Sequence, residues 1–148
     1  MQNTFIMIKP LGLHNFLLEI MARVRALGDI QERRLIPVSE ELIAAHYAEH
    51  ASKPFFAGLT DYYVGKTVLA LKVAGPDVVA RTRAIMGPSN PREAAPDQIR
   101  YLPLTKWRDG EDGWRNIELC TSRVDNLIHA SDSPEAAQRE LKLWGFSR

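Results

Sequence analysis

The chain has a single cysteine, no long hydrophobic run and almost no net charge. Because Cys120 is alone among 148 residues, neither an intrachain disulfide nor a cysteine-based metal cluster can form. No apolar run approaches the roughly 20 residues of a membrane span, and the N-terminus lacks the basic start and apolar stretch of a secretory signal. These absences predict a protein of the reducing cytoplasm with no membrane partner.

The charge balance excludes a general attraction to polyanions. The formal net charge is +1, with 25% charged and 45% apolar residues, which is the composition of a globular protein. We therefore expect no specific nucleic-acid partner, and any anion site has to be local. The length suits one domain, residues 1–148, with a core of ordinary size.

Apolar patterning predicts strands that alternate with helices. The expected strands are residues 4–8, 30–38, 67–73 and 126–129. The expected helices cover residues 13–27, 39–47, 77–86 and a last segment that holds Ala137, Leu141 and Trp144 on one face. This order favours one sheet covered by helices, and the pattern alone allows either a parallel doubly wound sheet or a split arrangement with antiparallel pairs.

Residues 101–125 interrupt that rhythm. Two Asp-Gly pairs, at 109–110 and 112–113, mark a turn, so we expect a hairpin here. Trp107 and Trp114 flank the turn. Local packing is the preferred expectation for both, and pairing across the hairpin or packing on a neighbouring subunit are the alternatives.

A histidine lies between the last apolar run and a strong helix start. Ser133 is a good N-cap and Pro134 suits the first helical position, so free N–H groups would point back toward His129 and favour a phosphate there. A neutral imidazole, with an ordinary pKa of about 6.5, is also a nucleophile, and the carboxylate of Glu140 could orient it. This segment alone favours the plainer alternative, a capped loop histidine with a solvated Glu140.

Several separated motifs resemble the nucleoside diphosphate kinase family. They follow the order of that family and extend from about Thr4 to Trp144, nearly the whole chain. The motifs are residues 4–10, His46-Tyr47, 53–59, 83–91, 94–96, Ile99-Arg100 and 126–133.

The resemblance implies an α/β fold of the α+β kind, a ferredoxin-like sandwich with a mainly antiparallel four-stranded sheet covered by helices. It implies a ping-pong enzyme that moves the γ-phosphate of a nucleoside triphosphate to a nucleoside diphosphate through a phosphohistidine on His129. Glu140 would support that histidine by a hydrogen bond, and Lys9 and Tyr47 would also be catalytic. The nucleotide site would consist of Lys9, Phe55, Leu59, Arg83, Ser89, Arg100 and Asn126.

Within that site the resemblance implies that Phe55 stacks on the base and that Asn126 binds a ribose hydroxyl. The remaining polar residues would contact phosphates or ribose, which suits a reaction that depends on positioning and charge neutralisation. Taken singly, Lys9 would be a solvated charge, Phe55 a core residue and Arg83 a surface cation. The expected partners are ATP, other nucleoside tri- and diphosphates and further copies of the chain in a homo-oligomer.

The expected cofactor is Mg²⁺ carried by the nucleotide phosphates, since this ion needs few protein ligands. No metal site is assigned to the protein itself. His46 and His50 have the i, i+4 spacing of a zinc-binding pair, but no third ligand is evident and a position on a helix surface is expected.

Some residues depart from the family. Leu11 replaces an aspartate, residues 12–17 are one residue short, Ala130 replaces a glycine, and an insertion within 101–125 lengthens a loop that normally shapes the oligomer and one wall of the base site. Three hypotheses follow: an active kinase, a non-catalytic nucleotide-binding or regulatory module, and a phosphohistidine carrier for a protein partner. The retained polar set favours the active kinase.

Overall fold

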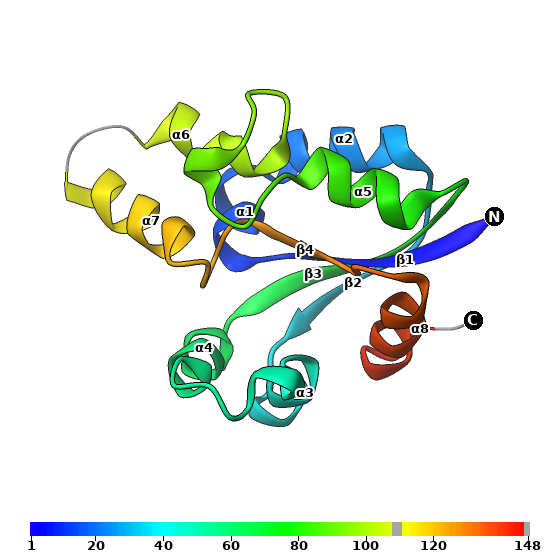
Figure 1. The fold of residues 1–148 in the computed structure, drawn as a ribbon, viewed down its shortest axis with the longest axis horizontal. Helices are drawn as coiled ribbons and strands as arrows, with labels where there is room; N and C mark the ends of the chain where they lie inside the picture. The colour runs from blue at the N-terminus through cyan, green and yellow to red at the C-terminus, as the bar shows by residue number, and fades with distance from the viewer. Residues whose placement is uncertain (108–110, 147–148) are drawn as a thin grey trace.

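Four antiparallel strands form the sheet at the centre of the computed structural model (Figure 1). The structure describes residues 1–107 and 111–146, except for the side chains of residues 111, 112 and 114. The strands, in the spatial order β2-β3-β1-β4, are β1 (Gln2–Ile8), β2 (Asp29–Pro37), β3 (Thr67–Gly75) and β4 (Ile128–Ala130). All three neighbouring pairs are antiparallel, which confirms the mainly antiparallel ferredoxin-like sheet and excludes a doubly wound parallel one.

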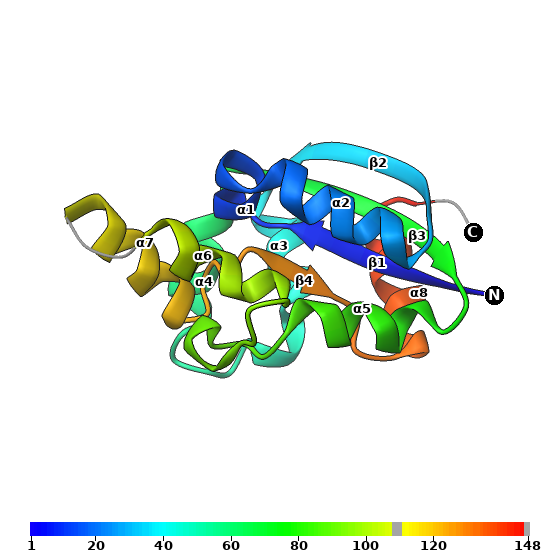
Figure 2. The ribbon, with the colours of Figure 1, turned by 90° about the horizontal axis from the view of Figure 1, so that it is seen from above.

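Helices cover both faces of this sheet. Figure 1 shows α2 and α5 on one face and α3, α4 and α8 on the other, and Figure 2 shows α2 and α5 from above. The α-helices are α1 (Pro10–Asn15), α2 (Leu17–Leu27), α3 (Glu40–His46), α4 (Phe56–Tyr63), α5 (Val78–Met86), α6 (Leu102–Lys106), α7 (Glu111–Thr121) and α8 (Pro134–Leu143). Short 3₁₀ turns lie at Ala48–His50, Pro91–Glu93 and Ile99–Tyr101. None of these described helices is long and apolar enough to cross a bilayer.

The two faces of β1 belong to two separate cores. Ile6 and Ile8 pack in the cluster that contains residues of α2 and α5, whereas Phe5 and Met7 pack in the cluster that contains residues of α3, α4 and α8. Successive strand residues point to opposite faces, so a strand covered on both sides reads as one continuous apolar run. His129 pairs with Met7 across the sheet and therefore shares the face of α3 and α8.

Two expected element boundaries differ from the structure. The helix expected over residues 13–27 is two helices, because the backbone of Phe16 leaves the helical region (φ −138°, ψ 23°). Its side chain is buried against Trp107, with ring centroids 5.4 Å apart. The strand expected over residues 126–129 is β4, Ile128–Ala130, because Leu127 has a positive φ of 76° that interrupts extended backbone.

The expected hairpin within residues 101–125 is wrong. The segment forms α6 and α7, and Ile117 and Cys120, three positions apart on α7, are buried in the same core cluster as Trp107. Trp107 thus packs within the chain, as expected. The Asp109-Gly110 turn and the side chain of Trp114 lie outside the described residues, and Gly113 belongs to α7 rather than to a turn.

The first turn of α8 has the expected cap. Ser133 accepts a hydrogen bond from the Ala136 amide at 3.0 Å, and Pro134 occupies the first turn. Replacing Ser133 with alanine should lower the free energy of unfolding by about 1 kcal/mol, because one N-terminal amide of the helix loses its acceptor. Urea denaturation measures this loss. S52A is the matched control in an exposed loop position, and an equal loss in both variants would contradict a capping role.

Candidate active site

The residues singled out in the sequence gather around one cavity of about 540 Å³. Of the predicted catalytic and nucleotide-binding residues, every one except Glu140 lines this cavity, although they come from the end of β1, the α3–α4 region, α5, β4 and the segments between them. The lining residues are Lys9, Tyr47, His50, Lys53, Phe55, Leu59, Arg83, Ser89, Arg100, Ser122, Arg123, Val124, Asn126 and His129. Glu140 is not a lining residue and lies within hydrogen-bond distance of His129, which is one.

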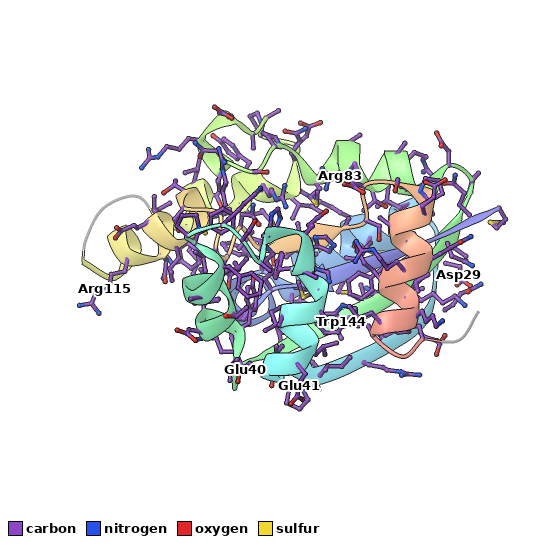
Figure 3. All side chains as sticks on the ribbon, turned by 60° about the horizontal axis from the view of Figure 1, so that its bottom comes forward. Asp29, Glu40, Glu41, Arg83, Arg115 and Trp144 are labelled. Carbon is purple, nitrogen blue, oxygen red and sulfur yellow. The ribbon has the colours of Figure 1, made fainter. Side chains whose placement is uncertain are left out.

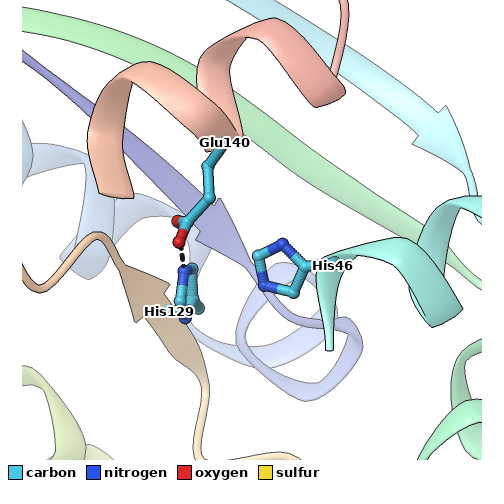
Figure 4. A group of neighbouring side chains, drawn as sticks. All are labelled: His46, His129 and Glu140. Carbon is cyan, nitrogen blue, oxygen red and sulfur yellow. Dashed lines mark hydrogen bonds and ion pairs between the residues drawn. The ribbon is translucent and has the colours of Figure 1, made fainter. Parts of the chain in front are cut away.

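His129 and Glu140 form a close pair (Figure 4). The distance from His129 Nε2 to Glu140 Oε1 is 2.7 Å, and Ser131 Oγ donates to the same oxygen at 3.0 Å. Glu140 is buried, with 4% of its surface exposed, so the solvated carboxylate that the segment alone favoured is wrong. An ionised Glu140 accepts the proton on Nε2, which leaves Nδ1 of the ring with its lone pair.

The surroundings keep His129 neutral. Burial, followed by the positive charges of Lys9, Arg100 and Arg83, lowers the pKa of the imidazole to about 3. The His129 side chain is nevertheless 21% exposed, so the ring is accessible from the cavity. At neutral pH it is therefore an uncharged, reachable nucleophile in an electropositive pocket.

Lys9 is buried rather than solvated. Its ammonium donates to Asn126 Oδ1 at 2.8 Å, and Asn126 Nδ2 donates to the Ser89 carbonyl at 2.8 Å. Burial, with a further contribution from Arg100, lowers the pKa of Lys9 to about 7. These bonds hold three of the expected nucleotide-binding residues in one connected row.

Two arginines hold the backbone on either side of His129. Arg83 donates from Nη1 to the Ala130 carbonyl at 3.2 Å, and Arg100 donates from Nη2 to the Ile128 carbonyl at 2.7 Å. Arg100 also reaches the Gly87 carbonyl at 3.0 Å, and burial beside Arg83 lowers its pKa to about 10. Figure 3 shows Arg83 on α5, next to the segment that enters α8. Both guanidinium groups thus lie close to the nucleophile.

The aromatic residue at the cavity is exposed. Phe55 has 53% of its surface accessible, so it is not the core residue that it would be by itself, and Leu59 beside it is buried. An accessible ring at a cavity wall provides a stacking platform for a base. Tyr47 is the C-cap of α3, and burial raises the pKa of its phenol to about 12, so it stays a neutral donor.

The sequence reasoning missed the wall contributed by residues 122–124. This segment follows α7, and two tyrosines of α4 hold it: Tyr63 donates to the Val124 carbonyl and Tyr62 to Asp125 Oδ2, each at 2.6 Å. No periodicity or motif marks these contacts, because they join residues about 60 positions apart. His50 and Lys53 were also missed as lining residues, although both lie beside the matched motifs.

His46 is buried, not on a helix surface as expected. It has 4% of its surface exposed, and its Nδ1 accepts a hydrogen bond from Trp144 Nε1 at 3.1 Å. The fold also brings it the neighbours that were not evident in the sequence, since the ligand atoms of His46, His129 and Glu140 lie within 4.8 Å of one another. Trp144 already occupies Nδ1 of His46, and the His129–Glu140 pair is bonded internally. The absence of a protein-bound metal remains a prediction.

Two histidines with lowered pKa values predict a loss of stability in acid. Burial and the charges around them lower the pKa values of His46 and His129 to about 3, against about 6.5 in the unfolded chain. Between these values the unfolded state binds more protons at these two rings, so their contribution to the free energy of unfolding should fall as the pH falls from about 6.5 toward 3. Urea midpoints at several pH values measure this slope. H46N should show a shallower dependence of the urea midpoint on pH, and an unchanged dependence would contradict the lowered pKa of His46.

The chain is similar to nucleoside diphosphate kinases over nearly its whole length. The sequence profile of the family described as nucleoside diphosphate kinase matches residues 2–147. A nucleoside diphosphate kinase of Exiguobacterium sibiricum is 41% identical over 146 residues, covering 97% of this chain and 94% of the relative. One from Thermus thermophilus is 38% identical over 146 residues, covering 97% of this chain and 95% of the relative.

Solved structures of the same kind have the same fold. The apo enzyme from Encephalitozoon cuniculi has a TM-score of 0.82 at 29% identity and covers 99% of this chain and 90% of its own. The enzyme from Aquifex aeolicus has a TM-score of 0.80 at 30% identity, covering 99% of this chain and 95% of its own. A halophilic enzyme from Halobacterium salinarum, solved in complex with CDP, has a TM-score of 0.77 at 31% identity and covers 97% of this chain and 86% of its own.

Proposed function

This chain belongs to the nucleoside diphosphate kinase family, and we propose that His129 is the residue through which it transfers phosphate. As a member of the family it is an enzyme of nucleotide metabolism that binds nucleotides and moves the γ-phosphate of a nucleoside triphosphate to a nucleoside diphosphate. A non-catalytic module of the same fold is not favoured. The observation that carries the assignment of His129 is its 2.7 Å contact with the buried Glu140, which leaves Nδ1 free.

In the first half-reaction, Nδ1 of His129 attacks the γ-phosphorus. A P–N bond forms, the bond from phosphorus to the bridging oxygen breaks, and the electron pair of that bond leaves with the nucleoside diphosphate. The proton stays on Nε2, where the Glu140 carboxylate offsets the positive charge that develops on the ring. In the second half-reaction a terminal oxygen of another nucleoside diphosphate attacks the phosphorus, and the P–N electron pair returns to Nδ1.

The cations of the cavity stabilise the transferring phosphoryl group. Lys9, Arg83 and Arg100 all line the cavity beside His129, and hydrogen bonds to neighbouring groups fix each of them before substrate arrives. Preorganised positive charge in a partly dry site stabilises developing negative charge without reorganisation at the moment of reaction. Tyr47 supplies a neutral O–H donor to the same phosphates.

The rest of the cavity suits the nucleoside. In this proposal Phe55 stacks on the base, Asn126 binds a ribose hydroxyl and Ser89 contacts phosphate or ribose, and Leu59 lines the same cavity. Stacking needs only the π-face that every base has, so this arrangement accepts purines and pyrimidines alike.

The reaction needs a divalent cation, and we propose that Mg²⁺ fills that role on the nucleotide. Among the described residues that line the cavity, none is aspartate or glutamate, so the phosphate oxygens supply the ligands that this hard cation prefers. When bound with the nucleotide, the ion would neutralise phosphate charge. Chelation with EDTA should therefore abolish transfer, because Lys9 and the two arginines do not replace the cation, and excess Mg²⁺ should restore it in a coupled assay. Full activity in EDTA would contradict this.

Labelling with γ-labelled ATP tests the function. The protein should become labelled in an acid-labile, base-stable form and should then pass the label to added GDP. Nucleotide binding without label would instead support the non-catalytic module, and label that never reaches GDP would support a carrier for a protein partner.

Three further properties belong to this proposal. The described core clusters contain residues from the first strand to the last helix and support a single domain, residues 1–148, and the spacing of the family motifs supports an insertion within 101–125. A homo-oligomer and a cytoplasmic location follow from the family resemblance and from the single cysteine.

A further inference from the structure

We infer that His46 is a positioning residue for His129, and that Trp144 sets the tautomer in which His46 does this. The inference rests on the proposed role of His129 as the phosphate acceptor. His46 does not line the cavity and is therefore not in contact with the nucleotide. It acts on the reaction only through the ring beside it.

The first step is the bond that fixes the proton on His46. Trp144 lies on the side of α8 that faces α3 (Figure 3), and its indole N–H donates to His46 Nδ1 at 3.1 Å. An indole N–H can only donate, so Nδ1 of His46 has to be the unprotonated nitrogen. In a neutral ring the proton is then on Nε2.

The second step is the contact between the two imidazoles. The ring centroids of His46 and His129 are 4.6 Å apart and the planes meet at 82°, so the rings are perpendicular. Figure 4 shows an edge of His46 directed at His129, while Glu140 approaches His129 from another side. A perpendicular arrangement places the positive edge of one ring against the negative face of the other.

The third step is that the contact with His46 restrains the His129 ring in a way that the hydrogen bond to Glu140 does not. A hydrogen bond at Nε2 fixes one atom of the His129 ring but still permits the ring to turn about χ2, which would swing Nδ1 away from the phosphorus. His46 blocks that rotation. Phe5 supports the whole group, with its ring centroid 6.0 Å from both His46 and His129 and 5.3 Å from Trp144.

The charge of His46 agrees with this role. Burial, followed by the neighbouring His129, lowers the pKa of His46 to about 3, so it is neutral at physiological pH. A neutral ring neither repels Lys9 and the two arginines nor competes with His129 for the carboxylate of Glu140.

Two variants of His46 separate positioning from folding. Asparagine can place an acceptor near the position of Nδ1 and keep the Trp144 bond, but it lacks the edge that contacts His129. Glutamine can place an N–H donor near the position of Nε2 and restore part of that edge. Single-turnover phosphorylation by ATP should be slower in H46N by at least about tenfold, with the Kd for ATP within about twofold of wild type, and H46Q should recover part of the rate.

An H46N protein that is phosphorylated as fast as wild type would overturn the inference, as would a loss confined to the Kd for ATP. Wild-type protein that takes no label at all would instead refute the proposed function, so the two failures are distinguishable.

W144F gives an independent measurement if H46N does not fold. ¹⁵N NMR should show His46 of the wild type with its proton on Nε2, and W144F should shift the population toward the other tautomer and slow phosphorylation in parallel. A changed tautomer with an unchanged rate, or an unchanged tautomer in W144F, would overturn the inference.

Discussion

Replacing His129 with glutamine is expected to lower nucleotide phosphotransfer by at least about 10⁴-fold, because an amide cannot form the phosphoenzyme. The glutamine amide can still donate to Glu140, which sits within hydrogen-bond distance of the native ring at 2.7 Å. The fold and the cavity should therefore survive. A coupled assay measures the activity, and labelled ATP measures the phosphoenzyme, which should be absent.

The control for this variant is nucleotide binding. Calorimetry with a nucleoside diphosphate should give a Kd close to that of wild type, because Lys9, Phe55 and Arg100 are unchanged and line the same cavity. Label that persists in H129Q would place the phosphate on another residue and refute the assignment.

Replacing Arg100 with lysine should lower kcat by about 10²–10³-fold, although the charge is conserved. Arg100 is buried, with 5% of its surface exposed, and its guanidinium group donates hydrogen bonds to the Ile128 and Gly87 carbonyls at 2.7 and 3.0 Å. A lysine ammonium is a point charge that cannot span both carbonyls in this geometry. The unpaired carbonyl should also lower the free energy of unfolding by about 1–3 kcal/mol.

Steady-state kinetics and urea denaturation together measure these two effects. R92K is the matched control, since Arg92 is exposed and lies outside the cavity that His129 lines. It should leave both quantities within error of wild type. A normal kcat in R100K would mean that the charge alone matters and that the two-carbonyl geometry does not.

The elements that the sequence predicts well are those whose signals are local. Ser39 and Ser133 cap helices at the expected residues, and Gly87 ends α5 with a positive φ of 91° that suits glycine. Each of these signals depends on a few neighbouring residues. The central strands β1 and β3 were likewise visible because both of their faces are covered, which leaves continuous apolar runs.

The elements that the sequence does not predict depend on distant contacts. The helices within residues 101–125 are fixed by packing on Phe16 and by the core cluster that Ile117 joins, and no local pattern records those partners. The burial of Glu140 and His46 follows from the way α8 and α3 pack beside β4, since His46 and Trp144 are 98 residues apart in sequence. The motifs predicted the site residues through family resemblance, whereas the physical environment of these residues required the fold.

The strand order has a consequence for the time at which the enzyme becomes active during synthesis. The last strand, β4, pairs with the first, and Lys9 meets Asn126 across 117 positions of sequence. A growing chain thus carries Lys9, Tyr47, Arg83 and Arg100 before His129 has been made, and Glu140 follows later still. Closing such long loops costs entropy that is recovered only when both ends are present. A nucleotide bound as proposed, between residues from both ends of the chain, should therefore stabilise the finished protein against separation of its first and last segments.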